Sequence, residues 1–394
     1  MRTKLLLNLL ALIIMEPGLA RAQSLSPASS QKSPQIDLKG LIKKATSGNT
    51  ESQLKLGFAY QFGRGVDEDI KESMRWYRRA ANSGDPMAQN NLGYLYETGP
   101  EGVKDLEEAA RWYMRSAVDG NPEGQLNLGL LYLKGTGVQQ STEDALGWIR
   151  RAVDAEHPRA LTVLAYLHAT GQGVPKDPNK AFQLARKAAG KHEPSGQALL
   201  GALYAEGSGV SKDSAQAAKW FKKAADAGEA SAQYGLGIMY EVGQGVKKDS
   251  QEALRLYRLA GEHGSVEAQE ILGEIYELGK GVNVDYQEAV AWYRRAINQG
   301  NTCSATRLGT MLFRGKGIEQ NVAEANKLWN WAADKGDSEA QFNLAEMYMT
   351  GSGVQRDIGK AYSLFTLAGK KLDVSKQLNE LSSQMIQGEM ASTH

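Results

Sequence analysis

Acidic, amide or hydroxyl side chains recur once every 36 residues along this sequence, shortly after a glycine-rich loop. They are Asp69, Asp105, Ser141, Asp177, Asp213, Asp249, Asp285, Asn321 and Asp357, and Glu72, Glu108, Gln216, Glu252, Glu288 and Glu324 follow six of them three positions later. Paired carboxylates could serve as general acid and base. The spacing is also that of helix N-caps with capping boxes. Ninefold repetition favours this structural role, so the sequence predicts no catalytic residue.

The glycine-rich loops raise a second possibility, the binding of phosphate. They begin at Gly63, Gly99, Gly135, Gly171, Gly207, Gly243, Gly279, Gly315 and Gly351. Each loop lacks the third glycine and the preceding strand of a nucleotide-binding loop, and nine copies would need nine ligands. We therefore interpret the glycines as ends of helices, where a left-handed backbone is needed, and predict no cofactor.

Histidine and cysteine offer little further chemistry. His157 and His192 could lie on neighbouring turns, but no Cys, Asp or Glu with ligand spacing surrounds them. Cys303 is the single cysteine, so the chain has no internal disulfide. We predict no metal site, and expect packing alone to stabilise the fold.

The elements that carry these residues repeat with the same period, which indicates a solenoid. A first helix, the A helix, carries Leu-Gly and a Tyr three positions further on, as at Leu56, Gly57 and Tyr60. A second helix, the B helix, carries core aromatic residues such as Trp76 and Tyr77. The sequence predicts an all-α fold: a right-handed α/α superhelical solenoid of about nine 36-residue helix-turn-helix repeats with terminal capping helices.

Composition agrees with an ordered chain, since 42% of the 394 residues are hydrophobic and 23% are charged. The net charge of +1 gives no bulk attraction to nucleic acid. Basic pairs near the ends of the B helices are more consistent with a solvated face than with an anion-binding stripe. These pairs are Arg78–Arg79, Arg150–Arg151, Arg186–Lys187, Lys222–Lys223 and Arg294–Arg295.

Residues 1–22 have the pattern of a cleavable signal peptide, with Arg2 and Lys4 before an apolar run and small residues before a cleavage site between Ala22 and Gln23. The alternative is a membrane anchor, but the apolar run is shorter than the roughly 20 residues that span a bilayer. We expect an exported protein without a membrane span after cleavage, periplasmic or secreted. The absence of an Asn-x-Ser/Thr acceptor favours a bacterial source over a eukaryotic secretory lumen.

The predicted organisation has five parts. Residues 1–22 form the signal peptide, 23–36 a disordered leader, 37–48 an N-terminal capping half-repeat, 49–372 nine repeats, and 373–394 a C-terminal capping helix and tail. The half-repeat keeps the register of a B helix without an A helix before it. Caps of this kind shield the ends of a solenoid.

The repeated columns of residues, together with a Gln column from Gln53 to Gln341, resemble the Sel-1-like repeat family over residues 37–370. The resemblance implies a tetratricopeptide-like superhelix that holds protein complexes together. Some members of that family are disulfide-rich and were associated with penicillin-like compounds. That property depends on a Cys pair in each repeat, so it does not extend to a chain with Cys303 alone.

The resemblance places a binding groove on the concave side, which the A helices line in tetratricopeptide-like folds. The residues predicted to face it are Phe58, Phe62, Asn90, Tyr94, Glu97, Leu130, Leu133, Tyr166, Tyr234, Ile238, Glu241, Glu270, Glu274, Glu277, Phe313, Phe342 and Met349. Phe, Tyr and Met are residue types that anchor interfaces. The alternative for any one of them is packing between successive A helices.

We therefore expect a non-enzymatic scaffold or adaptor that binds a protein or peptide, with the acids from Glu270 to Glu277 selecting a basic element. A periplasmic regulator or assembly factor for an envelope or secretion complex is the alternative. A hydrolase acting on cell-wall or β-lactam material is the third hypothesis, and no nucleophile, base and orienting residue in the sequence supports it.

Overall fold

The computed structural model describes residues 37–392, with side chains described through residue 385. The predicted signal peptide, the leader and the cleavage site at Ala22 and Gln23 lie outside the described residues. Every regular element within the described part is a helix, and these helices fall into two compact units, one ending at Ala227 and one beginning at Gly228. No helix within residues 37–392 is both long and apolar enough to cross a membrane.

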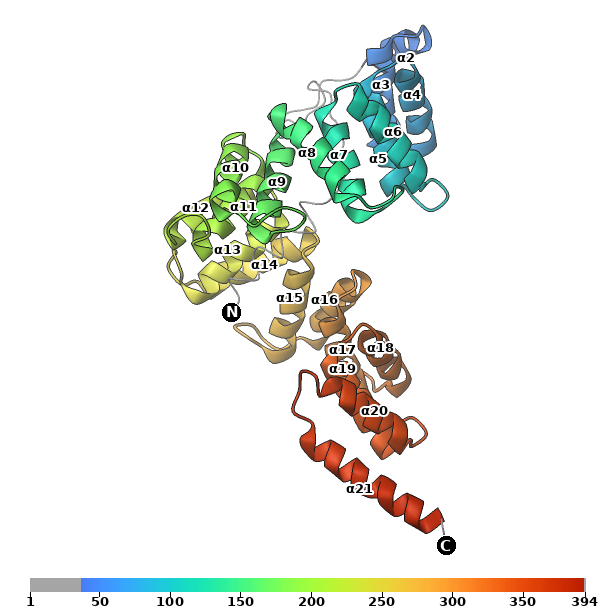
Figure 1. Cartoon of the computed structure of the whole chain (residues 1–394), viewed down its shortest axis with the longest axis vertical. Helices are drawn as coiled ribbons and strands as arrows, with labels where there is room; N and C mark the ends of the chain where they lie inside the picture. Colours follow the sequence, from blue (N-terminus) through green and yellow to red (C-terminus); the bar gives the residue numbers. More distant parts are fainter. Residues whose placement is uncertain (1–36, 393–394) are drawn as a thin grey trace. The chain divides into compact units, whose positions relative to one another are not determined.

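The first unit consists of consecutive helical hairpins (Figure 1). Its helices are α2 (Leu38–Thr46), α3 (Thr50–Gln61), α4 (Ile70–Asn82), α5 (Pro86–Thr98), α6 (Leu106–Val118), α7 (Pro122–Lys134), α8 (Thr142–Asp154), α9 (Pro158–Thr170), α10 (Pro178–Gly190), α11 (Pro194–Glu206) and α12 (Ser214–Asp226). From α3 onward, odd numbers are A helices and even numbers are B helices. The two helices of a repeat pack together, and α4, α6, α8 and α10 each pack against the next A helix.

The second unit continues the same pattern. Its helices are α13 (Ala230–Val242), α14 (Ser250–Glu262), α15 (Val266–Leu278), α16 (Tyr286–Asn298), α17 (Thr302–Arg314), α18 (Val322–Asp334), α19 (Ser338–Thr350), α20 (Ile358–Ala368) and α21 (Ser375–Ser392). The B helices α14, α16 and α18 each pack against the following A helix. The predicted fold class, a nine-repeat α/α solenoid with all-α content, is confirmed.

The glycine of the A helix permits close packing within a hairpin. A Cβ atom at Gly273 of α15 would lie 2.3 Å from the ring of Tyr293 of α16, which is 0% exposed. Such a contact is far shorter than van der Waals distance. The aromatic core of the B helix therefore requires a residue without a side chain opposite it.

The predicted N-caps are confirmed, because in all nine B helices the side chain of the cap residue accepts a hydrogen bond from the first turn. The predicted capping boxes are wrong in their second half. The N–H of Asp69 donates to the carbonyl of Tyr60 at 2.9 Å rather than to Glu72, and Glu72 pairs with Arg75 at 3.0 Å. The backbone N–H of every B-helix cap is used in this way by the A helix of its own repeat.

The Gln column joins successive repeats. Nε2 of Gln125 on α7 donates to the carbonyl of Ala117 on α6 at 3.2 Å, and Gln269 on α15 reaches Gly261 on α14 at 2.9 Å. Gln53 makes the same bond to Ala45 of α2 at 3.1 Å. Helix α2 therefore contacts α3 as a B helix contacts the next A helix. At the other end of the chain, α21 packs against α20.

Candidate partner-binding site

The predicted groove residues divide according to burial. Six of them are buried, which corrects their assignment to an open groove: Phe58, Asn90, Leu130, Tyr166, Tyr234 and Ile238. Their side chains fill the space between packed helices, as the packing alternative describes. Phe62 is 43% exposed, and the others are half-buried.

In the first unit, Phe58 belongs to a buried cluster against which Tyr94 also packs. The rings of Phe58 and Phe62 lie 4.5 Å apart by their centroids, and the guanidinium of Arg64 lies 5.0 Å from the Phe58 ring. Tyr94 is a partly buried side chain that packs against two clusters, one formed mainly by α3, α4 and α5 and the other by α6 and α7. Leu133 is half-buried on α7.

Three predicted glutamates accept a hydrogen bond from a buried tyrosine of the following B helix. The Oη atoms of Tyr113, Tyr257 and Tyr293 donate to Glu97, Glu241 and Glu277 at 3.0, 2.8 and 2.8 Å, respectively. Burial, followed by the neighbouring Glu97, raises the pKa of Tyr113 well above its usual value. These carboxylates therefore hold their hairpins together in addition to any role on the surface.

The second unit brings three predicted glutamates together with cations that the sequence analysis did not single out. We call Glu270, Glu274, Glu277, Arg307 and Lys316 the charged cluster. Glu274 lies 2.6 Å from Lys280 and 3.8 Å from Arg307, and Lys316 lies 2.9 Å from Glu277. Asn301 donates to Glu270 at 2.8 Å. The acids thus have partners within the chain, from α17, the turn before it and the loops after α15 and α17.

The sequence held a weak signal for these cations. Lys280 and Lys316 occupy the same position of the glycine-rich loop in successive repeats, directly after Gly279 and Gly315. Arg307 lies in an A helix, and Ile271 occupies the equivalent position 36 residues earlier. Register alone could place them near the glutamates, but it could not show which loop lysine reaches which carboxylate.

Cys303 lies beside the charged cluster at the start of α17 and is half-buried. Burial, with a contribution from Glu270, raises the pKa of its thiol to about 12. A thiol that stays protonated is a poor nucleophile. The geometry therefore gives Cys303 the character of a packed side chain.

The remaining predicted residues have aromatic or apolar neighbours. The Phe313 ring lies 5.3 Å from that of Trp329, and the Phe342 ring lies 5.3 Å from that of Phe365. Phe342 and Met349 pack at the edge of the last buried cluster. All three predicted side chains are half-buried, so each keeps part of its surface open.

The two histidines considered as ligands have different surroundings. His157 is the N-cap of α9, and its Nε2 atom lies 3.0 Å from Glu123, which also pairs with Arg159. His192 is exposed in the turn after α10. Within the described residues, no three His, Cys, Asp or Glu side chains gather as metal ligands would.

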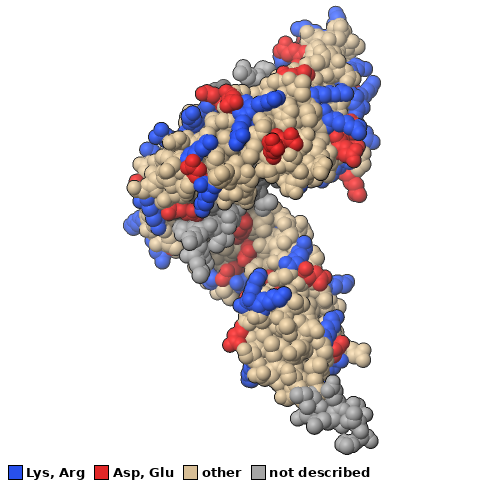
Figure 2. Space-filling model, viewed as in Figure 1, with Lys and Arg blue, Asp and Glu red and all other residues tan. Residues whose placement is uncertain are grey.

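The basic pairs of the B helices have structural contacts of their own, and Figure 2 shows Lys and Arg interspersed with Asp and Glu on the visible face. Several of these cations stack on tryptophan within their own helix. Arg79 lies 4.6 Å from the Trp76 ring, and Arg295 lies 4.4 Å from the Trp292 ring. Such contacts give these residues a structural role that needs no anionic ligand.

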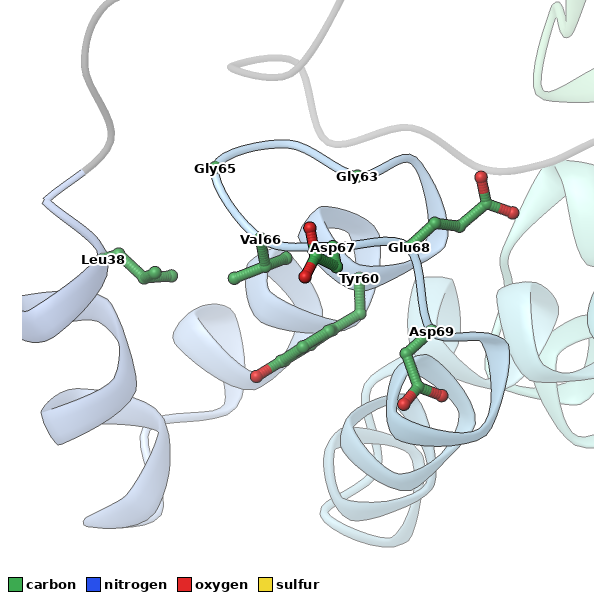
Figure 3. A pocket seen from close by; sticks show the side chains of 8 residues that line it. All are labelled: Leu38, Tyr60, Gly63, Gly65, Val66, Asp67, Glu68 and Asp69. Atoms are coloured by element: carbon green, nitrogen blue, oxygen red, sulfur yellow. The ribbon is translucent and has the colours of Figure 1, made fainter.

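Two pockets lie at corresponding places in different repeats. The first, of about 680 Å³, opens between α2 and the loop after α3 and is lined by Leu38, Tyr60, Gly63, Gly65 and residues 66–69. Figure 3 shows Leu38 directed toward Val66, with the Tyr60 ring beneath the loop. The second, of about 400 Å³, lies between α16, α17 and the loop after α17.

The paired helices, the closing bonds and the half-exposed A-helix residues define an α/α repeat protein of the solenoid class. A family model described as Sel1 repeat matches residues 50–85, 86–121, 122–157, 158–191, 194–229, 230–265, 266–301, 304–337 and 338–371. The chain therefore belongs to the Sel1 repeat family. Proteins of this family are generally scaffolds for protein–protein interaction and are typically not catalytic.

Solved structures of Sel1 repeat proteins resemble the chain over most of its length. A Sel1 repeat protein from Oxalobacter formigenes is 31% identical over 85% of this chain and 99% of its own, with a TM-score of 0.55. The protective antigen c5321 of uropathogenic Escherichia coli, which has an SLR fold, is 29% identical over 89% of this chain and 86% of its own, with a TM-score of 0.47. No curated protein sequence matches the chain.

Proposed function

We propose that the chain is a scaffold that holds a protein or peptide partner on the A-helix surface of α15, α17 and α19. The choice of this surface is based on one observation. All six predicted residues on these three helices are half-buried, whereas those on the preceding A helix, α13, include the buried Tyr234 and Ile238. Partly open aromatic and methionine side chains are residue types that anchor interfaces, and charged groups beside them set specificity.

A basic element of the partner would bind at Glu274. Its side chain is 23% exposed, and the cations that now face it, Lys280 and Arg307, are 51% and 36% exposed. Ion pairs this open to water stabilise a fold by only about 0–1 kcal/mol. A lysine or arginine of a partner can therefore replace Lys280 at Glu274 at little expense to the fold.

Apolar contacts would supply most of the affinity. Phe313, Phe342 and Met349 present partly open surfaces on α17 and α19. Burying an aromatic side chain in an interface contributes more than a charge at its rim, which mainly sets specificity and the rate of association. The proposal assigns the chain no catalytic step, and the signal-like residues 1–22 support an exported, periplasmic or secreted location.

Affinity capture tests this proposal. The mature chain from Gln23 is immobilised and exposed to envelope extract and culture medium of the native organism. The variant Glu274→Lys reverses the charge at the proposed contact, and Glu262→Lys makes the same change at an exposed position of α14. We expect a protein to be retained by the wild type and by Glu262→Lys, and retained at least tenfold less by Glu274→Lys. Equal retention by all three proteins would refute the proposed location of the binding surface.

A further inference from the structure

Leu312 occupies a position that holds tyrosine in most repeats. The equivalent residues are Tyr60, Tyr96, Tyr132, His168, Tyr204, Tyr240, Tyr276 and Tyr348. The structure confirms the equivalence, because the carbonyl of each accepts the N–H of the B-helix cap of its own repeat. For Leu312, that donor is Asn321 at 2.9 Å. The eighth repeat therefore has the same backbone here and a shorter, apolar side chain.

In two other repeats the tyrosine accepts a hydrogen bond from an arginine of the preceding B helix. Nε of Arg258 on α14 donates to Oη of Tyr276 at 2.9 Å, and Arg78 donates to Tyr96 in the same register. In another repeat, the rings of Phe182 and Tyr204 meet edge to face, with centroids 5.4 Å apart. In these three repeats the space beside the A helix thus holds a tyrosine ring, with an arginine or another aromatic ring as its neighbour.

The eighth repeat lacks the tyrosine ring. Leu312 stands where Tyr204 does, and Val290 stands at a position that holds Phe182 in one repeat and aliphatic side chains such as Leu146 and Leu254 in others. The result is the pocket of about 400 Å³, whose apolar walls are Val290, Leu312 and Ile318. Polar atoms come from Gln287, Arg294, Glu319, Gln320, Asn321 and Glu324.

Arg294 is present in the eighth repeat, although Leu312 replaces the tyrosine to which the equivalent arginine, Arg258, donates. It lies one repeat after Arg258 and now pairs with Glu324 at 2.9 Å. The two side chains are 54% and 32% exposed, so water and a ligand can reach both. The pocket therefore combines apolar walls with a cationic donor and an anionic acceptor at its mouth.

The pocket in the first repeat, shown in Figure 3, lies where the arginine is missing rather than the tyrosine. There Tyr60 is present, but Ile42 of α2 takes the position of the arginine. Both pockets lie beside an incomplete arginine–tyrosine pair, and such pairs also occur at Met114–Tyr132 and Asn330–Tyr348. In the first repeat the ring is present and lines the wall, so the space suited to a phenol is the one in the eighth repeat.

We propose that the pocket of Val290, Arg294, Leu312, Ile318 and Glu324 binds the side chain of a tyrosine from a protein partner. The ring would contact the three apolar side chains. The phenolic oxygen would accept a hydrogen bond from Arg294, as Tyr276 accepts one from Arg258, and its O–H would donate to Glu324. The partner's tyrosine would restore the arrangement that the chain builds internally in other repeats.

This site is separate from the proposed A-helix surface, because it is lined by α16, the end of α17, the loop that follows and Glu324 at the start of α18. The occupant is argued from the aromatic residues of the chain itself and from the matching donor and acceptor. A pocket of this volume falls within the range of sites that bind small ligands. Its test needs no knowledge of the partner protein.

The first experiment measures the binding of 4-methylphenol, which is the side chain of tyrosine, to the mature chain by calorimetry or ligand-observed NMR. We expect a dissociation constant of about 1 mM, a modest affinity for so few atoms. Leu312→Tyr fills the pocket from within and should weaken binding at least tenfold. Its helical circular dichroism should be unchanged, since tyrosine is the common residue at this position. No binding to the wild type, or binding unaffected by Leu312→Tyr, would overturn the proposal.

Two further variants test the geometry. Tyr276→Leu should create a second site beside Arg258 and raise the number of 4-methylphenol molecules bound by one. Arg294→Met keeps the aliphatic stem and removes the donor. It should abolish the preference of the pocket for 4-methylphenol over toluene, and an unchanged preference would contradict the assigned role of Arg294.

A last comparison tests the polypeptide source of the ring. N-acetyltyrosinamide carries the same phenol on a peptide backbone, and N-acetylphenylalaninamide lacks only the hydroxyl. We expect the tyrosine amide to bind at least as tightly as 4-methylphenol and about tenfold more tightly than the phenylalanine amide. Binding of 4-methylphenol with exclusion of both amides would overturn the assignment to a protein tyrosine.

Discussion

Tyr293 of α16 and Glu277 of α15 form a hydrogen bond of 2.8 Å, and the tyrosine is 0% exposed. The residues at these two positions, 16 residues apart, are matched in all nine repeats. Four repeats pair a tyrosine with a polar residue: Tyr77 with Gln61, Tyr113 with Glu97, Tyr257 with Glu241 and Tyr293 with Glu277. The other five pair two apolar residues: Ile149 with Leu133, Ala185 with Ala169, Phe221 with Ala205, Trp329 with Phe313 and Phe365 with Met349. A phenol in the B helix is thus always matched by an acceptor 16 residues earlier, as the bond of Tyr77 to Gln61 also shows.

Tyr293→Phe should destabilise the second unit by about 1–2 kcal/mol, because the half-buried carboxylate of Glu277 loses a donor. Urea unfolding followed by circular dichroism measures the change. The matched control is Phe221→Tyr, which places a hydroxyl opposite Ala205 where no acceptor stands. It should also destabilise, whereas a neutral or stabilising Phe221→Tyr would show that the column pairing has no energetic basis.

Gly273→Ala should destabilise the fold by about 1–3 kcal/mol, because the new methyl group would have to displace the buried Tyr293 ring. Gly147 is a helical glycine in α8 with no atom near its hypothetical Cβ. Gly147→Ala should therefore stabilise by about 0.5–1 kcal/mol through helix propensity. Thermal unfolding of the two variants should shift in opposite directions, and a shift in the same direction would contradict the packing argument.

Glu123→Gln should destabilise the first unit by about 2 kcal/mol at pH 7 and much less in acid. Burial raises the pKa of Glu123, but Arg159 and His157 together hold it below its ordinary value of 4.5. A lowered carboxyl pKa gives stability that is present above the ordinary pKa and is lost as the pH falls through the native value. Urea midpoints of wild type and variant should converge as the pH falls below 4.5. A constant gap from pH 7 to pH 3 would refute this role.

Cys303 should react slowly with thiol reagents in the native chain. With its pKa raised to about 12 from 9.0, the thiolate fraction at pH 8 falls by roughly a thousandfold. Rates of modification by iodoacetamide at pH 8, with and without 8 M urea as denaturant, should differ by about 100-fold or more. Similar rates in the two conditions would show that the thiol is accessible and ionised in the folded chain.

The period of the sequence predicted the hairpins and the core because both depend on local spacing. Tyr113 and Tyr293 could be assigned to the core from the repeat alone, and Asp69 to an N-cap. Burial of Phe58, Tyr166 and Ile238 could not be predicted in this way. It depends on how closely successive A helices approach one another, and that distance is set by side chains of neighbouring repeats.

For the charged cluster, too, the sequence predicted which residues share a helix but not which residues of the loops contact them. The sequence indicated Glu270, Glu274 and Glu277 as acids on one helix. It did not indicate that Lys280 and Lys316 return from loops to pair with two of them. Long, flexible cations reach several carboxylates from one backbone position, so register restricts their partners without choosing among them.

The bond between each A-helix carbonyl and the B-helix cap has a consequence for how such a chain can change its length. Tyr60 and Asp69 close their hairpin without help from any other repeat, and so do their counterparts. Gaining or losing a whole 36-residue unit therefore leaves every remaining closure intact. Shorter insertions must be absorbed inside a loop, as in Gly99–Gly102, where one extra residue before Val103 is offset before Asp105. Gene duplication can extend this protein in whole units, while point insertions are restricted to the loop tips.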